Sequence, residues 1–111
     1  EISYNVLNNY PNSTADFIQT EQYRNMNEIL KDHPLCISLA MEAMKLAGLS
    51  PETTSIRGGT DGSRLTFMGL PCPNLFTGEM AFHGKHEYVS VQDMEKSSEV
   101  LVHLVGLWSQ V

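Results

Sequence analysis

The stretch from residue 56 to residue 89 constrains the fold most, because glycine and proline interrupt its apolar runs at short intervals. A Gly-Gly pair and Gly69 can each end an element, and the Pro-Cys-Pro run at 71–73 excludes a continuous helix. We therefore expect a strand that ends at the Gly-Gly pair, a short helix, a second strand at 74–77 and a loop at 79–86. Such a series of short elements is typical of the site-forming part of an α/β enzyme.

The clearest helix is predicted over residues 34–47. Pro34 stands at the first helical position, where the missing N–H does no harm, and Gly48 supplies a left-handed stop. One apolar stripe along this helix is formed by Leu35, Leu39 and Ala43.

A second amphipathic helix is predicted at the end of the chain. Ser90 is a favourable N-cap, and Asp93 occupies the third position of the helix, as in a capping box. Helical spacing predicts one buried face, formed by Met94, Leu101, Leu104, Val105 and Trp108.

The N-terminal part alternates short elements with turns. We expect the end of a helix over residues 1–8, a strand over 15–23 and a short helical turn capped by Asn25. The Ser50-Pro51-Glu52 break after the 34–47 helix suggests two structural units. The helix at 34–47 and the last helix should then share no core.

Charge and cysteine usage limit the class of protein. The net charge is −6, from 7 basic and 13 acidic residues, which argues against a nucleic-acid-binding surface. No apolar run approaches the roughly 20 residues that span a bilayer, so we expect no membrane partner.

Cys36 and Cys72 have neither disulfide-framework nor zinc-ribbon spacing, which favours free thiols in a reducing compartment. Glu1 opens the chain without an initiator Met or a signal peptide, so we interpret the chain as a piece of a longer protein.

The strongest candidate for chemistry is the His-Gly-Lys-His-Glu run at 83–87. Imidazole is the commonest metal ligand and needs a partner to fix its tautomer. Glu87 could be that partner, or a second ligand if the loop folds back, and Gly84 leaves room beside His83. Zinc takes about four ligands, and the sequence shows no second cluster with ligand spacing. His83 is thus either one ligand of a site completed elsewhere or part of a solvated loop.

The second candidate is the Arg-Gly-Gly-Thr-Asp-Gly run at 57–62. Arg57 places a planar cation beside bare backbone, which suits a bidentate grip on a carboxylate. A helix capped by Asp61 would add N–H donors that favour an anion. The alternative is a tight turn in which Arg57 pairs with an acidic neighbour. The run lacks the GK[ST] element of a P-loop and the GxGxxG dinucleotide pattern.

Three segments together resemble the peptidase T family of zinc tripeptide aminopeptidases. They are HPLCISLAMEAM, IRGGTDGSRLTFMGLPCPNLFTG and FHGKHEYV, the last followed by an amphipathic helix. The resemblance covers residues 22–108, and RGGTDG and HGKHE are its most specific elements. The Glu-Met-Ala run at 79–81 departs from the glycine- and aromatic-rich run that the family has at this place. This departure bears on the shape of the loop more than on the ligand it carries.

The resemblance implies an α/β fold: the C-terminal fragment of a two-zinc aminopeptidase, with a mixed β-sheet flanked by helices. Residues 1–49 would be the end of an α+β lid domain of the dimerisation type, and residues 50–111 the end of the catalytic domain. His83 would be the last ligand of a two-zinc centre, and Arg57 would hold the C-terminal carboxylate of the substrate. The remaining ligands and the general base would lie outside this chain, so no catalytic residue is expected within it.

The resemblance further implies a cytoplasmic metallopeptidase that releases the N-terminal residue of tripeptides and whose remaining polypeptide is a partner of this segment. A homodimer is compatible with it, and the 111-residue chain alone should be inactive. Two other interpretations stay open. One is a non-catalytic module that binds a small carboxylate through Arg57, and the other is an inactive structural fragment.

Overall fold

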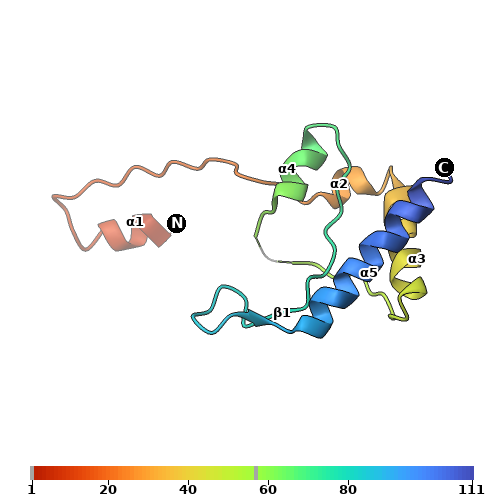
Figure 1. Ribbon diagram of the computed structural model, residues 1–111. Helices are drawn as coiled ribbons and strands as arrows, with labels where there is room; N and C mark the ends of the chain where they lie inside the picture. Colours follow the sequence, from red (N-terminus) through yellow and green to blue (C-terminus); the bar gives the residue numbers. More distant parts are fainter. Residues whose placement is uncertain (1, 57) are drawn as a thin grey trace.

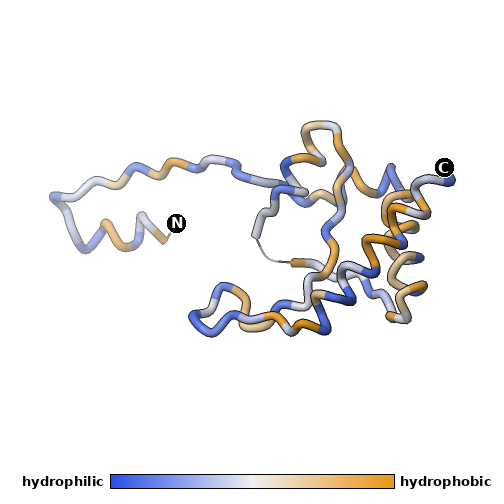
Figure 2. Tube along the Cα trace, viewed as in Figure 1, coloured by the Kyte–Doolittle hydropathy of each residue, from blue (hydrophilic) through white to orange (hydrophobic). Residues whose placement is uncertain are grey.

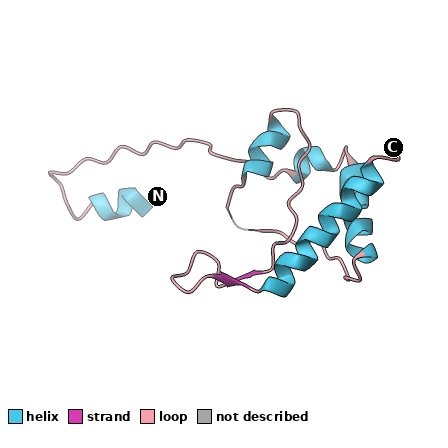
Figure 3. Cartoon of the chain, in the orientation of Figure 1, coloured by secondary structure: helices cyan, strands magenta, loops and turns pink. Residues whose placement is uncertain are grey.

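The computed structural model describes every residue except 1 and 57. In chain order, its elements are α1 (Ile2–Leu7), α2 (Asn27–Leu30), α3 (Pro34–Leu46), α4 (Asp61–Phe67), β1 (Glu79–Met80), β2 (Tyr88–Val89) and α5 (Val91–Trp108) (Figures 1 and 3). The two short helical segments predicted in the N-terminal part, the helix end over residues 1–8 and the helical turn after Asn25, are confirmed as α1 and α2. The predicted Asn25 cap is wrong by one residue: Met26 precedes α2 as its N-cap, without a side-chain cap bond, and Asn25 Oδ1 accepts a hydrogen bond from the backbone N of Asn27 at 3.0 Å.

Helices α3 and α5 pack side by side and form the main core (Figure 1). Ala43, Ala47 and Val100 are buried at its centre, because the two small alanine side chains let the helices approach closely. Around them pack Met44, Leu49, Phe76, Leu104 and Leu107. The expectation that these helices share no core is wrong: the Ser50-Pro51 break follows the end of α3 but does not separate two cores. The division of the chain into two domains at residue 49 stays a prediction, and separate cores for α3 and α5 no longer support it.

Both predicted ends of α3 are confirmed. Pro34 occupies its first turn, and Gly48 has a φ of 78°, in the left-handed region. The N–H of Gly48 bonds to the carbonyl oxygen of Lys45 at 2.9 Å, and that of Leu49 bonds to Met44 at 2.9 Å. This pair of bonds is a Schellman motif, which satisfies carbonyls that the helix end would otherwise leave unpaired.

The buried face of α5 is rotated from the predicted one. Val100 is 1% exposed, whereas Val105, placed in the predicted stripe, is 70% exposed. Three more residues of that stripe are exposed: Met94, Leu101 and Trp108. The inner face of α5 also carries polar side chains. One is Ser97, whose hydroxyl donates a hydrogen bond to the carbonyl oxygen of Phe76 at 3.3 Å. Apolar residues lie on both faces of α5, so spacing alone does not select the inner one.

The predicted strands at 15–23, 53–56 and 74–77 are absent from the described residues, which pair as strands only in the β1–β2 ribbon. The mixed sheet is therefore not seen in this part of the chain. Residues 15–23 instead form an extended arm (Figure 1), on which Phe17 and Ile18 are 82% and 86% exposed. A strand is stabilised by a neighbour that satisfies its backbone, and the arm has none among the described residues.

The chain buries little surface for its size. Its radius of gyration is 20.2 Å and its extents are 66 × 36 × 19 Å. A compact domain of this length has a radius of gyration of about 13 Å. Its accessible surface is 9197 Å², against about 6,100 Å² for a folded monomer of this mass. Among the described residues, the fully buried apolar side chains are few: Leu30, Ala40, Ala43, Ala47 and Val100.

Apolar residues concentrate along α3 and the C-terminal half of α5 (Figure 2). In the described ranges, no helix has both the length and the apolar composition required to cross a bilayer. Cys36 and Cys72 are half-buried free thiols, as predicted.

Candidate functional site

The histidine loop, residues 81–87, is carried on a two-stranded antiparallel ribbon. Glu79 pairs with Val89 and Met80 pairs with Tyr88, so the two ends of the loop are held together. The second strand of the ribbon, β2, is followed by Ser90 and then directly by α5. Figure 3 shows the ribbon and its loop projecting away from the two packed helices.

The base of the ribbon is fixed to the start of α5. The predicted cap is confirmed, because Ser90 Oγ accepts a hydrogen bond from the backbone N of Asp93 at 3.0 Å. Gly78 has a φ of 80° and lies so close to Asp93 that an added Cβ would stand 2.3 Å from the Asp93 Cβ. Only glycine therefore lets the chain turn into the ribbon against the capped end of α5.

Within the loop, the backbone adopts left-handed conformations at two residues that are not glycine. Ala81 has a φ of 55° and His83 a φ of 61°. The N–H of Gly84 bonds to the carbonyl oxygen of Ala81 at 2.7 Å, and an added Cβ on Gly84 would stand 2.7 Å from the same oxygen. Gly84 thus permits the tight turn itself, which differs from the expectation that it leaves room for a ligand.

His83 is exposed, and its ring lies 4.0 Å from the ring of Phe82, centroid to centroid. The loop does fold back, as considered from the sequence, but Glu87 does not reach the imidazole. Its Oε2 instead accepts a hydrogen bond from the backbone N–H of His83 at 2.8 Å. Among the hydrogen bonds of the described residues, none involves the imidazole of His83, so the ring is available to a group from elsewhere.

The described part of the chain does not form a complete metal site. It contains no group of three or more His, Cys, Asp or Glu side chains that could hold an ion. A structural or catalytic zinc ion needs at least three protein ligands, and the exposed His83 offers one nitrogen donor. The donor set therefore fits the contribution of a single ligand to a larger site and does not fit a zinc centre within this chain.

The Arg-Gly-Gly-Thr-Asp-Gly run is the second candidate, but Arg57 lies outside the described residues. Two of the glycines after it, Gly59 and Gly62, are explained by packing. An added Cβ on Gly59 would stand 2.3 Å from the ring of Tyr23, and one on Gly62 would stand 2.8 Å from the carbonyl oxygen of Cys72. These positions need glycine because neighbouring segments cross them closely.

Thr60, which the sequence analysis passed over in favour of Asp61, caps α4. Its side chain accepts a hydrogen bond from the backbone N of Ser63 at 3.2 Å, and Asp61 is the first helical residue. Asn74 is the other neighbour of Thr60, with its Nδ2 3.2 Å from the threonine Oγ1. The predicted Asp61 cap is wrong by one residue, since two acceptable cap residues are adjacent in the sequence.

The turn after α4 is fixed by a buried hydroxyl that the sequence analysis also missed. Thr66 Oγ1 donates to the carbonyl oxygen of Gly62 at 2.7 Å and accepts from the backbone N of Cys72 at 3.0 Å. Gly69 has a φ of 100° and ends the helix, as predicted. Threonine in a short helix gives no sequence pattern for such a role, because most helical threonines face solvent.

The arm contacts α4 at residues 21–24. Ser63 Oγ donates to the carbonyl oxygen of Arg24 at 2.9 Å, and the Arg24 guanidinium lies 5.1 Å from the centre of the Phe67 ring. A shallow hollow of about 720 Å³ lies between the arm and α4, and its lining includes Tyr23 and Arg64 but not His83. Figure 1 shows α4 and the histidine loop at separate places in the molecule.

Comparison with known proteins gives one matching family and many relatives. The model of Peptidase family M20/M25/M40 matches residues 14–106. Proteins named Peptidase T are similar over most of the chain. Those of Caldanaerobacter subterraneus subsp. tengcongensis and Escherichia coli strain SE11 are 48% and 46% identical over 101 residues, and that of Aeromonas hydrophila subsp. hydrophila is 50% identical over 99 residues.

These alignments cover 91%, 91% and 89% of the chain, respectively, but only 25%, 25% and 24% of the three relatives. The chain thus spans about a quarter of the length of the proteins it matches.

Proposed function

Because the chain belongs to Peptidase family M20/M25/M40, we propose that it is the C-terminal segment of a zinc-dependent aminopeptidase that releases the N-terminal residue of tripeptides. The observation that carries this proposal is the identity of 46–50% to proteins named Peptidase T across about nine tenths of the chain. The aligned region includes both candidate motifs, the run at 57–62 and the histidine loop.

In this proposal the chain contributes two functional side chains to the parent enzyme. His83 supplies one metal ligand, supported by an exposed imidazole on a loop whose two ends are fixed. Arg57 holds the C-terminal carboxylate of the substrate, for which the planar guanidinium is well suited. When bound, zinc would polarise the scissile carbonyl and activate a water molecule.

A carboxylate clamp also accounts for a preference for tripeptides. The distance from the metal centre to the guanidinium is set by the fold, so only a peptide of one length places its charge at Arg57 and its first peptide bond at the metals. The general base and the other ligands lie in the rest of the parent polypeptide. The isolated 111-residue chain is therefore inactive in this account.

The rest of the parent is also the partner that covers the exposed apolar residues. The exposed apolar residues of α5 include Met94, Leu101, Val105 and Trp108, and the accessible surface of 9197 Å² far exceeds that of a self-contained domain. We place the enzyme in the cytoplasm, where free thiols such as Cys36 and Cys72 stay reduced.

The proposal is tested with the purified full-length parent. A free tripeptide should be cut at its first peptide bond, whereas an N-acetylated tripeptide and a dipeptide should be poor substrates. A chelator should abolish cleavage and added Zn²⁺ should restore it. Cleavage that starts at the C-terminal bond, or that persists after complete removal of metal, would contradict the proposal.

A further inference from the structure

We propose that Glu87 is a positioning residue for His83, acting through the backbone. The carboxylate of Glu87 accepts a hydrogen bond from the backbone N–H of His83 at 2.8 Å, so it fixes the direction in which the imidazole leaves the loop. This inference rests on the proposed role of His83 as a metal ligand. It differs from the roles that the sequence left open for Glu87, namely a ligand or a partner of the imidazole.

The backbone of His83 needs such support. Its φ of 61° and that of Ala81, 55°, lie in the left-handed region, which residues with a Cβ avoid. A conformation of this kind persists where the surroundings hold it, and it is found mainly at functional sites. The bond from Glu87 is the one that reaches His83 from the opposite end of the loop.

Glu87 is itself well placed to hold the loop. Its own N–H bonds to the carbonyl oxygen of Gly84 at 3.1 Å, and it directly precedes β2, whose pairing with β1 closes the loop. Among the described residues no ion pair involves Glu87, including with Lys85 in the same loop. The carboxylate is therefore engaged by the His83 amide and not by a competing cation.

Two substitutions separate this role from the alternatives. In Glu87→Gln the side chain keeps an oxygen that can accept the His83 N–H, but it loses the negative charge. In Glu87→Ala the acceptor is lost altogether. A positioning residue tolerates glutamine far better than alanine, whereas a metal ligand or a charged partner of the imidazole fails with both.

The experiment measures zinc affinity in the full-length parent by competition with a chelating dye. We expect Glu87→Ala to weaken zinc binding about 10- to 100-fold, as loss of a residue that orients a ligand does. Glu87→Gln should stay within about threefold of the wild type, since it can make the same hydrogen bond. Glu95→Ala is the matched control, because Glu95 is an exposed carboxylate on α5 with no hydrogen bond among the described residues, and it should have no effect.

A second measurement follows the His83 amide directly by hydrogen exchange in the full-length parent. Exchange should accelerate about tenfold or more in Glu87→Ala and stay slow in Glu87→Gln. Equal losses with alanine and glutamine, or an unchanged amide in Glu87→Ala, would overturn the proposal. If His83→Ala leaves zinc affinity intact, the proposed metal role fails, and amide exchange alone then decides whether Glu87 holds the loop.

Discussion

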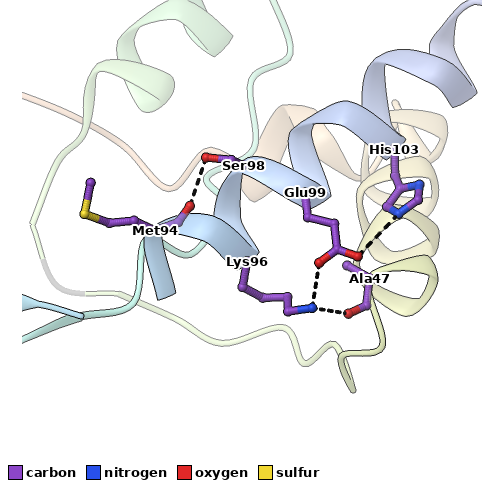
Figure 4. Close-up of polar contacts among 6 residues, drawn as sticks. All are labelled: Ala47, Met94, Lys96, Ser98, Glu99 and His103. Atoms are coloured by element: carbon purple, nitrogen blue, oxygen red, sulfur yellow. Dashed lines mark hydrogen bonds and ion pairs between the residues drawn. The ribbon is translucent and has the colours of Figure 1, made fainter. Parts of the chain in front are cut away.

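Lys96 on α5 donates a hydrogen bond from its Nζ to the carbonyl oxygen of Ala47, 3.0 Å away, at the C-terminal end of α3 (Figure 4). The same ammonium lies 2.6 Å from Glu99 Oε2. A cation at the end of a helix is favourable because the last carbonyls are unpaired there and carry partial negative charge. This contact joins the two helices that form the main core.

Removal of the Lys96 ammonium should loosen the α3–α5 pair. Lys96→Met keeps most of the aliphatic side chain and loses the bond to Ala47, so we expect the free energy of unfolding to fall by about 1–2 kcal/mol. Lys45→Met is the control, since the Lys45 side chain is exposed and pairs only with Glu42 on its own helix. Urea denaturation measures both, and an equal loss in the two variants would show that the interhelical bond contributes nothing specific.

The neighbouring Glu99 gives stability a dependence on pH. The side-chain hydrogen bond from Lys96 lowers the pKa of Glu99 below its ordinary 4.5, and the charges of Lys96 and His103 act in the same direction. A lowered folded-state pKa contributes stability that is present above pH 4.5 and is lost as the pH falls through the folded pKa. In Glu99→Gln, the unfolding midpoint should therefore fall less than in the wild type as the pH is lowered below 4.5. A midpoint in the variant that falls as steeply as in the wild type would remove Glu99 from this account.

Gly59 should be intolerant of any side chain for steric reasons. An added Cβ would stand 2.3 Å from the Tyr23 ring, so Gly59→Ala should cost about 1–3 kcal/mol by forcing the arm away from α4. The cost should shrink when Tyr23→Ala is combined with it, because the clash then disappears. Gly106→Ala is the control: it meets nothing within 4 Å and lies inside α5, so it should be neutral or stabilising.

The role of Arg57 is tested in the full-length parent with two substrates. If its guanidinium grips the substrate carboxylate, Arg57→Ala should reduce kcat/KM for a free-acid tripeptide about 30- to 1000-fold, the effect of losing about 2–4 kcal/mol. A C-terminally amidated tripeptide should already be poor and should be little affected by the variant. Zinc content should not change. Equal losses on the two substrates would argue against a carboxylate clamp.

Features fixed by local chemistry could be predicted from the sequence. The ends of α3 follow from Pro34 and Gly48, and the start of α5 follows from Ser90 and Asp93, because caps depend on a few adjacent residues. The predicted strands failed for the opposite reason. A strand depends on a partner, and the partners of residues 15–23 and 74–77 are not among the described elements.

The inner face of α5 could not be predicted either, because both faces carry apolar residues. Packing against Ala43 and Ala47 selects Val100, and no spacing within α5 encodes that choice. At the candidate site, the sequence identified His83 and Glu87 as neighbours in a loop but not the bond between them. That bond depends on the left-handed backbone of His83, which is uncommon for residues other than glycine and cannot be read from the sequence.

The other proposals for the parent enzyme depend on the proposed role of His83 as a zinc ligand. The most direct test compares the zinc content and the tripeptide turnover of the full-length parent with those of His83→Ala. His86→Ala is the control, because His86 is an exposed imidazole in the same loop with no hydrogen bond among the described residues. We expect His83→Ala to lose zinc and nearly all kcat with every substrate, and His86→Ala to keep both. A His83→Ala protein that retains its full zinc content and a normal kcat would contradict the proposed role.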